Sequence, residues 1–173
     1  MVRADGRAKV DGADVFGADW APPDALWMRV VRSPHPRAKL ALGDLEAVVQ
    51  RTPGLERILT ADDVPGENSF GIFAHLRDQP VLAPGQVRFR GEAVLALVGK
   101  RAAVYGISDA ELPIAWTPLD PLAGIDAALA PGAPQLHGHA PQNVLTRGNL
   151  RRGDAAAAHA TSVVCLKSIH FIS

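Results

Sequence analysis

The sequence contains a single cysteine, Cys165, among its 173 residues. One cysteine excludes an intrachain disulfide, a zinc site built on several cysteines and a cysteine-ligated iron–sulfur cluster within this chain. Aromatic residues make up only 5% of the sequence, which argues against a platform for stacking single-stranded nucleic acid. The apolar stretches are far shorter than the ~20 residues of a membrane span. The N-terminus, MVRADGRAKVDG, has no apolar run typical of a signal peptide, so we expect a cytoplasmic protein without a membrane partner.

An excess of charge of either sign is also missing, because 18 basic residues balance 18 acidic ones. Nucleic-acid binders usually carry a basic excess that displaces counterions, so no nucleic-acid partner is expected. Hydrophobic residues make up 47% of the chain, enough for one buried core. The 16 glycines and 14 prolines are scattered, which favours many short elements joined by tight turns over a helical bundle.

The apolar periodicity predicts short strands and helices in mixed order. Strands are expected near 14–16, at 24–32, 38–42, 55–60 and 113–117, twice within 86–100, and from 163 onward. Helices are expected at 44–52, 101–112, 124–129 and 154–159, and a capped turn at 60–63. Asp44 and Asp154 are suited to cap the helices that follow them. The order does not alternate regularly enough for a doubly wound sheet, so the predicted fold class is α/β (α+β).

The stretch VRFRGEAVLALV (87–98) holds the best charged cluster of the sequence. Val87 and Phe89 are expected to face inward, and Arg88, Arg90 and Glu92 to share the opposite face of a strand. These three charges could clamp an anion, form a salt bridge to another subunit or solvate a sheet edge. A solvated or interface role is favoured over catalysis, because the sequence names no nucleophile or acid–base partner for them.

Two histidines, His137 and His139, are the first candidates for a metal site, since residues at i and i+2 can reach one ion from an extended segment. A metal site needs a third ligand and outer support, and no recognisable spacing supplies them, so we interpret both as loop histidines. Cys165 near His159 or His170 is interpreted as a small core residue rather than a thiol–base pair.

Several short motifs occur in a characteristic order along the chain. They are RADGRAKVDG (3–12), FGAD (16–19), VRSPH (31–35), PG (53–54), ILTADDVPG (58–66), DQPVLA (78–83), VR (87–88) with GE (91–92), and RGD (152–154). In order and spacing they resemble the N-terminal α/β-hammerhead domain of the molybdenum hydroxylase large subunit. That family includes xanthine dehydrogenase, aldehyde oxidase and the carbon monoxide dehydrogenase large chain.

The resemblance implies a hammerhead domain over residues 1–164. Residues 165–173 depart from the family and are expected to mark a truncation or the end of a cloned piece, with the molybdopterin-binding domains absent; a small subunit of a split enzyme is the third possible origin. In the family those domains hold the cofactor and the catalytic glutamate, so this chain is expected to have no catalytic, cofactor-binding or metal-binding residues of its own.

The resemblance further implies an oxidoreductase that hydroxylates aldehydes or N-heterocycles. Molybdopterin would lie in the missing domains, and Fe–S clusters and FAD on partner domains or subunits. The chain itself is then a scaffold for assembly, with Arg88, Arg90 and Glu92 as candidate domain-interface residues.

An alternative is an independent module that binds a small ligand or a protein and reuses the same fold, because a fold does not fix a function. The two hypotheses predict different surfaces. A detached scaffold should expose an apolar patch where its partner domain docks. A stand-alone module should have one pocket with a polar rim.

Overall fold

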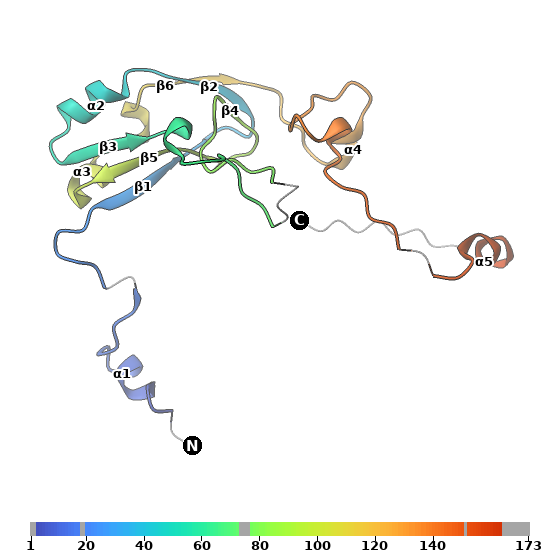
Figure 1. Cartoon of the computed structure of the whole chain (residues 1–173), viewed down its shortest axis with the longest axis horizontal. Helices are drawn as coiled ribbons and strands as arrows, with labels where there is room; N and C mark the ends of the chain where they lie inside the picture. The colour runs from blue at the N-terminus through green and yellow to red at the C-terminus, as the bar shows by residue number, and fades with distance from the viewer. Residues whose placement is uncertain (1–2, 18–19, 73–76, 151, 164–173) are drawn as a thin grey trace. The chain divides into compact units, whose positions relative to one another are not determined.

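The computed structural model describes residues 3–17, 20–72, 77–150 and 152–163 (Figure 1). The chain divides into two compact units, residues 1–124 and 125–173. The first unit contains both β-sheets and the hydrophobic core. Among the described helices, none is long and apolar enough to cross a membrane.

The first sheet contains three antiparallel strands in the order β1-β5-β3. They are β1 (Trp27–Arg32), β3 (Leu55–Leu59) and β5 (Ala93–Gly99). Residues 94–97 of β5 are all buried, and this strand has a hydrogen-bonded neighbour on each side. The unbroken apolar run therefore forms the central strand of this sheet, within the range 86–100 where the sequence predicts two strands.

Two helices, α2 (Leu45–Arg51) and α3 (Arg101–Gly106), pack on this sheet. The Asp44 carboxylate accepts a hydrogen bond of 2.9 Å from the backbone N–H of Ala47, which confirms the predicted N-cap. Val48 of α2 and Val104 of α3 are fully buried in the core with the side chains of β5. Burial of these apolar side chains is the main stabilising contribution to the unit.

A second sheet has the order β4-β2-β6, also antiparallel. Its strands are β2 (Ala38–Leu42), β4 (Gln86–Val87) and β6 (Ile114–Pro118). Together the small sheets and few helices confirm the predicted mixed α/β class.

The remaining elements are short. Among the described residues, the first unit has the 3₁₀ turns η2 (Ala61–Asp63) and η4 (Asp109–Glu111), each closed by a capping box. The second unit has α4 (Ile125–Leu129), η5 (Pro141–Asn143) and α5 (Ala155–Thr161). The Asp154 carboxylate accepts a hydrogen bond of 3.0 Å from the N–H of Ala157 and so caps α5, as predicted.

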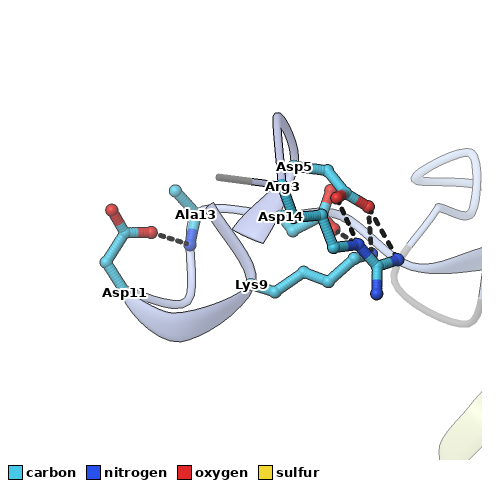
Figure 2. Close-up of polar contacts among 6 residues, drawn as sticks. All are labelled: Arg3, Asp5, Lys9, Asp11, Ala13 and Asp14. Atoms are coloured by element: carbon cyan, nitrogen blue, oxygen red, sulfur yellow. Dashed lines mark hydrogen bonds and ion pairs between the residues drawn. The ribbon is translucent and has the colours of Figure 1, made fainter. Parts of the chain in front are cut away.

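The N-terminal segment contains a short helix, α1 (Gly6–Val10), where the sequence predicts no helix but a strand near 14–16. Figure 2 shows the polar contacts that hold it. The Arg3 guanidinium bonds the Asp5 carboxylate at 2.5 Å, and the Lys9 ammonium bonds Asp14 at 2.8 Å. The Arg3 hydrogen bond holds the pKa of Asp5 below its usual value. The Asp14 N–H also donates to the Ala8 carbonyl at 2.9 Å, so residues 3–14 fold back on themselves and the predicted strand does not form.

The predicted helix over 101–112 is shorter in the structure, where α3 ends at Gly106 and η4 follows. Arg29 of β1 explains the break. Its guanidinium donates to the carbonyl oxygens of Val104 at 2.9 Å and Ile107 at 2.8 Å, and pairs with Asp109 at 2.5 Å. Because the Arg29 side chain of strand β1 binds these two carbonyls, they do not need amide partners from a longer helix.

Of two other predictions, one is wrong and one falls almost entirely on residues that the structure does not describe. Phe89 is exposed rather than inward-facing, because β4 ends at Val87 and the chain then turns. The strand predicted from residue 163 onward lies almost entirely outside the described residues.

Candidate functional site

The turn between β4 and β5, residues 88–92, holds a buried carboxylate. Gly91 has φ of +90°, a conformation that glycine adopts without strain. The Glu92 side chain is only 4% exposed and meets the Arg88 guanidinium at 3.2 Å. It also accepts a short hydrogen bond from the backbone N–H of Arg88. Glu92 is therefore engaged as an internal acceptor that closes the turn.

This turn is joined to the segment that follows β1. The backbone N–H of Ser33 donates to the Glu92 carbonyl at 2.9 Å, and the N–H of Gly91 donates to the Ser33 carbonyl at 2.9 Å. The Arg32 guanidinium adds a hydrogen bond of 2.8 Å to the Gly91 carbonyl. The VRSPH and RGE motifs, far apart in the sequence, thus form one hydrogen-bonded junction.

Ser33 and His35 do not form a nucleophile–base pair. The Ser33 hydroxyl donates to the backbone carbonyl of His35 at 2.9 Å and accepts from the His35 N–H at 3.1 Å. The His35 ring packs against Trp116 of β6, with ring centroids 5.3 Å apart. Both side chains hold the loop between β1 and β2 in place, which is a structural role.

A groove of about 530 Å³ lies over the face of the first sheet opposite the helices. The sheet contributes apolar side chains to its floor, namely Met28, Val30, Leu59 and Ala96. The connecting segments contribute its walls, including Pro65, Phe70, Val81 and Phe89. Strand alternation explains the arrangement, because Arg29 and Val31 point toward the helices while their neighbours Met28 and Val30 point into the groove.

Three charged residues line the groove: Arg32, Asp63 and Glu92. Asp63 accepts hydrogen bonds from the Thr60 N–H at 2.8 Å and from the Arg57 guanidinium at 2.5 Å. The hydrogen bonds from Thr60, and then that from Arg57, lower the pKa of Asp63. Asp63 and Glu92 thus already have cationic partners. Within the parts of the chain that the structure describes, no carboxylate lies at ion-pair distance from Arg32.

The three predicted interface residues do not share a strand face. Arg88 and Glu92 pair with each other inside the turn, and Arg90 is exposed on it. Their role at an interface stays a prediction.

Sequence reasoning missed Arg32 as a lining residue of the groove. The available signal was its spacing from Met28 and Val30, which places the three residues on one face of β1.

The histidine pair lies in the second unit, with the ring centroids of His137 and His139 5.8 Å apart. Over the described ranges, no group of three or more His, Cys, Asp or Glu side chains is placed to hold a metal ion. Cys165 and His170 lie outside those ranges.

An aromatic cluster lies beside α3, on the helix side of the first sheet. Trp27 and Tyr105 meet edge to face with centroids 6.1 Å apart, and the Arg101 guanidinium lies 5.2 Å from the Trp27 ring. This packing attaches α3 to the start of β1.

Comparison with known proteins identifies the fold. The family described as "aldehyde oxidase and xanthine dehydrogenase, a/b hammerhead domain" matches residues 11–106, more than half of the chain. A probable xanthine dehydrogenase subunit of Bacillus subtilis strain 168 is 31% identical over 88% of this chain. The nicotinate dehydrogenase large molybdopterin subunit of Eubacterium barkeri is 30% identical over 91% of this chain. The chain spans only 20% and 36% of these two proteins.

A solved structure gives the same result. The quinoline 2-oxidoreductase of Pseudomonas putida 86 superposes with a TM-score of 0.75 at 28% identity. The match covers 95% of this chain and 21% of that one. The structural likeness and the family match agree, and the chain belongs to the aldehyde oxidase and xanthine dehydrogenase family, as a member that carries its α/β-hammerhead domain.

Proposed function

We propose that this chain is the N-terminal hammerhead part of the large subunit of a molybdopterin-dependent hydroxylase, and that its own role is assembly rather than catalysis. The whole enzyme would hydroxylate aldehydes or N-heterocycles. Fe–S and FAD domains or subunits would accept the electrons. Support comes from the family match over 11–106 and from the short span of the chain within its relatives.

The observation that carries the assembly role is the junction of Ser33 with the 88–92 turn. The acidic group of this junction, Glu92, lines the groove but is buried and bonded to Arg88, so its carboxylate is already engaged within the domain. The junction's other groups are backbone amides and carbonyls that bond each other. Such a network fixes the shape of the domain around the turn.

The residues described here do not fit a molybdopterin site. Their left-handed glycines are spread singly over the turns instead of forming one phosphate-binding loop. We therefore assign the cofactor to the part of the large subunit that this chain does not span, and derive no catalytic step from these residues.

Two measurements test the proposal. The purified chain should contain far less than one molybdenum per molecule by mass spectrometry of the metal, and should oxidise neither xanthine nor nicotinate. An affinity-tagged chain expressed in its source organism should co-purify with a polypeptide that carries molybdopterin-binding domains. A stoichiometric molybdenum content in the isolated chain, or recovery without any such polypeptide, would contradict the proposal.

The groove supports the second candidate function, a ligand-binding module. Its volume of about 530 Å³ falls in the range of small-molecule pockets, roughly 300–1,000 Å³. Its lining, however, is largely apolar and includes the exposed side chains of Met28, Phe70 and Phe89, which fits a docking patch better than a pocket with a polar rim. Native mass spectrometry of the chain purified from its source organism would reveal a retained small molecule under this second hypothesis.

A further inference from the structure

We infer that the groove over the open face of the β1-β5-β3 sheet is the surface on which the chain docks the molybdopterin-binding part of the large subunit, through an apolar segment that carries a carboxylate for Arg32. The inference rests on the proposed function and adds the surface and the chemistry of the contact.

The groove exposes several large apolar side chains to solvent. Met28 is 60% exposed, Phe70 52% and Phe89 49%, and all three line the same groove. A large aromatic or thioether side chain left in water on one concave surface loses the stabilisation that burial would give it. A cluster of exposed apolar side chains is typical of a surface that another protein covers.

The charged residues of the groove indicate the chemistry of the segment that would bind there. The carboxylates of Asp63 and Glu92 are each paired with an arginine of this chain. Arg32 makes one hydrogen bond, to the Gly91 carbonyl, and no ion pair over the described part of the chain. A planar guanidinium has five N–H donors and binds a carboxylate in a bidentate manner. An apolar segment with one aspartate or glutamate beside Arg32 therefore complements the groove in shape and charge.

The length of the relatives favours a segment of the same enzyme over other occupants. In the quinoline 2-oxidoreductase, the matching region is 21% of the chain, so about four-fifths of that chain lies outside this domain. A domain within so long a chain has neighbours, and the apolar groove is a surface suited to contact one of them.

A photo-crosslinking experiment locates the contact. A p-benzoylphenylalanine is incorporated in place of Met28, in the groove, and in a matched sample in place of Gln50, an exposed residue of α2 on the helix side. Each tagged chain is expressed in the source organism, irradiated and purified, and crosslinked peptides are identified by mass spectrometry. The expected result is a crosslink from position 28, and not from position 50, to an apolar and acidic segment of the molybdopterin-binding polypeptide.

A charge reversal tests the role of Arg32. The Arg32→Glu variant should bind the co-purified polypeptide at least about tenfold more weakly by biolayer interferometry, since a charge-assisted contact becomes a repulsive one. Lys39→Glu makes the same change of charge on β2, outside the groove, and should bind as the wild type does. Val81→Asp, which alters only an exposed apolar side chain of the groove, should weaken binding even if Arg32→Glu folds poorly.

The outcomes separate the inference from the proposed function. A complex that forms without a crosslink from position 28, or that Arg32→Glu and Val81→Asp leave unchanged, overturns the inference and leaves the proposed function standing. A crosslink from position 28 to a second copy of the chain, or a small molecule retained in the groove, also overturns it. Failure to recover any molybdopterin-binding polypeptide overturns the proposed function and the inference together.

Discussion

Glu92 illustrates how a single residue acquires its role from contacts that its neighbours in sequence do not reveal. The sequence places it two residues from Arg90 and four from Arg88, and predicts a shared strand face. In the structure the strand ends at Val87, and the turn carries the Glu92 side chain inward to the Arg88 N–H and guanidinium. The burial depends on Ser33, whose backbone bonds the turn from a distant part of the chain.

The Glu92→Gln variant tests this structural role. It keeps the size of the side chain but removes the charge that Arg88 contacts at 3.2 Å. We expect the free energy of unfolding to fall by about 2 kcal/mol, the usual worth of a hydrogen bond to a charged group, measured by urea denaturation. Glu46→Gln, an exposed residue of α2, is the control and should change it by less than about 0.5 kcal/mol. Equal losses in both variants would contradict a specific role for Glu92.

At the scale of elements, the sequence predicts best those features that depend on residues close together. Asp44 caps α2 and Thr60 caps η2 through backbone groups two or three residues away, so the local rule suffices. The central position of β5 also follows from its own continuous apolar run. The end of α3 does not, because Arg29 binds the carbonyls there from a strand more than seventy residues earlier.

The distinction between local and distant contacts also applies to the candidate site. The motifs can be identified from the sequence alone, and the two-residue period of a strand predicts that Met28, Val30 and Arg32 lie on one side of β1. That this side stays uncovered by a helix depends on the packing of α2 and α3 on the opposite side. The groove could therefore be recognised only once the positions of both helices on the sheet were known.

The contact between β5 and β3 leads to a prediction for Gly99. This residue pairs with Trp27 on one side and Leu55 on the other. A Cβ atom at position 99 would lie 2.3 Å from the Gly54 carbonyl oxygen and 2.9 Å from the Leu55 Cα, both backbone atoms. The Gly99→Ala variant should lose about 3 kcal/mol of stability or more, since the paired strands cannot separate without breaking their ladder.

Gly106 provides the matched control for that variant. A Cβ atom there would have no neighbour within 4 Å, and the residue is the last of α3. Gly106→Ala should leave stability unchanged or raise it slightly, because alanine is the better helix former. Thermal unfolding followed by circular dichroism compares the two variants. Similar melting temperatures for both would show that the close approach at Gly99 is not a constraint.

At the scale of the whole molecule, the first unit contains the region that matches the family. Both sheets, the core and the groove lie within residues 1–124, as does the family match over 11–106. The last strand, β6, is secured after its end by contacts inside the same unit. The Leu119 N–H donates to the Arg37 carbonyl at 3.0 Å, and the Arg37 guanidinium donates to the Asp120 carbonyl at 3.0 Å.

A fragment of residues 1–124 should therefore fold by itself. The buried residues of its core cluster all lie between Val31 and Leu112, so we expect its melting temperature to lie within about 3 °C of the main transition of the whole chain. Domains with their own core generally fold as units. Differential scanning calorimetry of both proteins makes the comparison, with limited proteolysis expected to cut the whole chain after residue 124 first. A fragment that shows no cooperative transition would mean that residues 125–173 are part of the folding unit, which would support the longer domain predicted over residues 1–164.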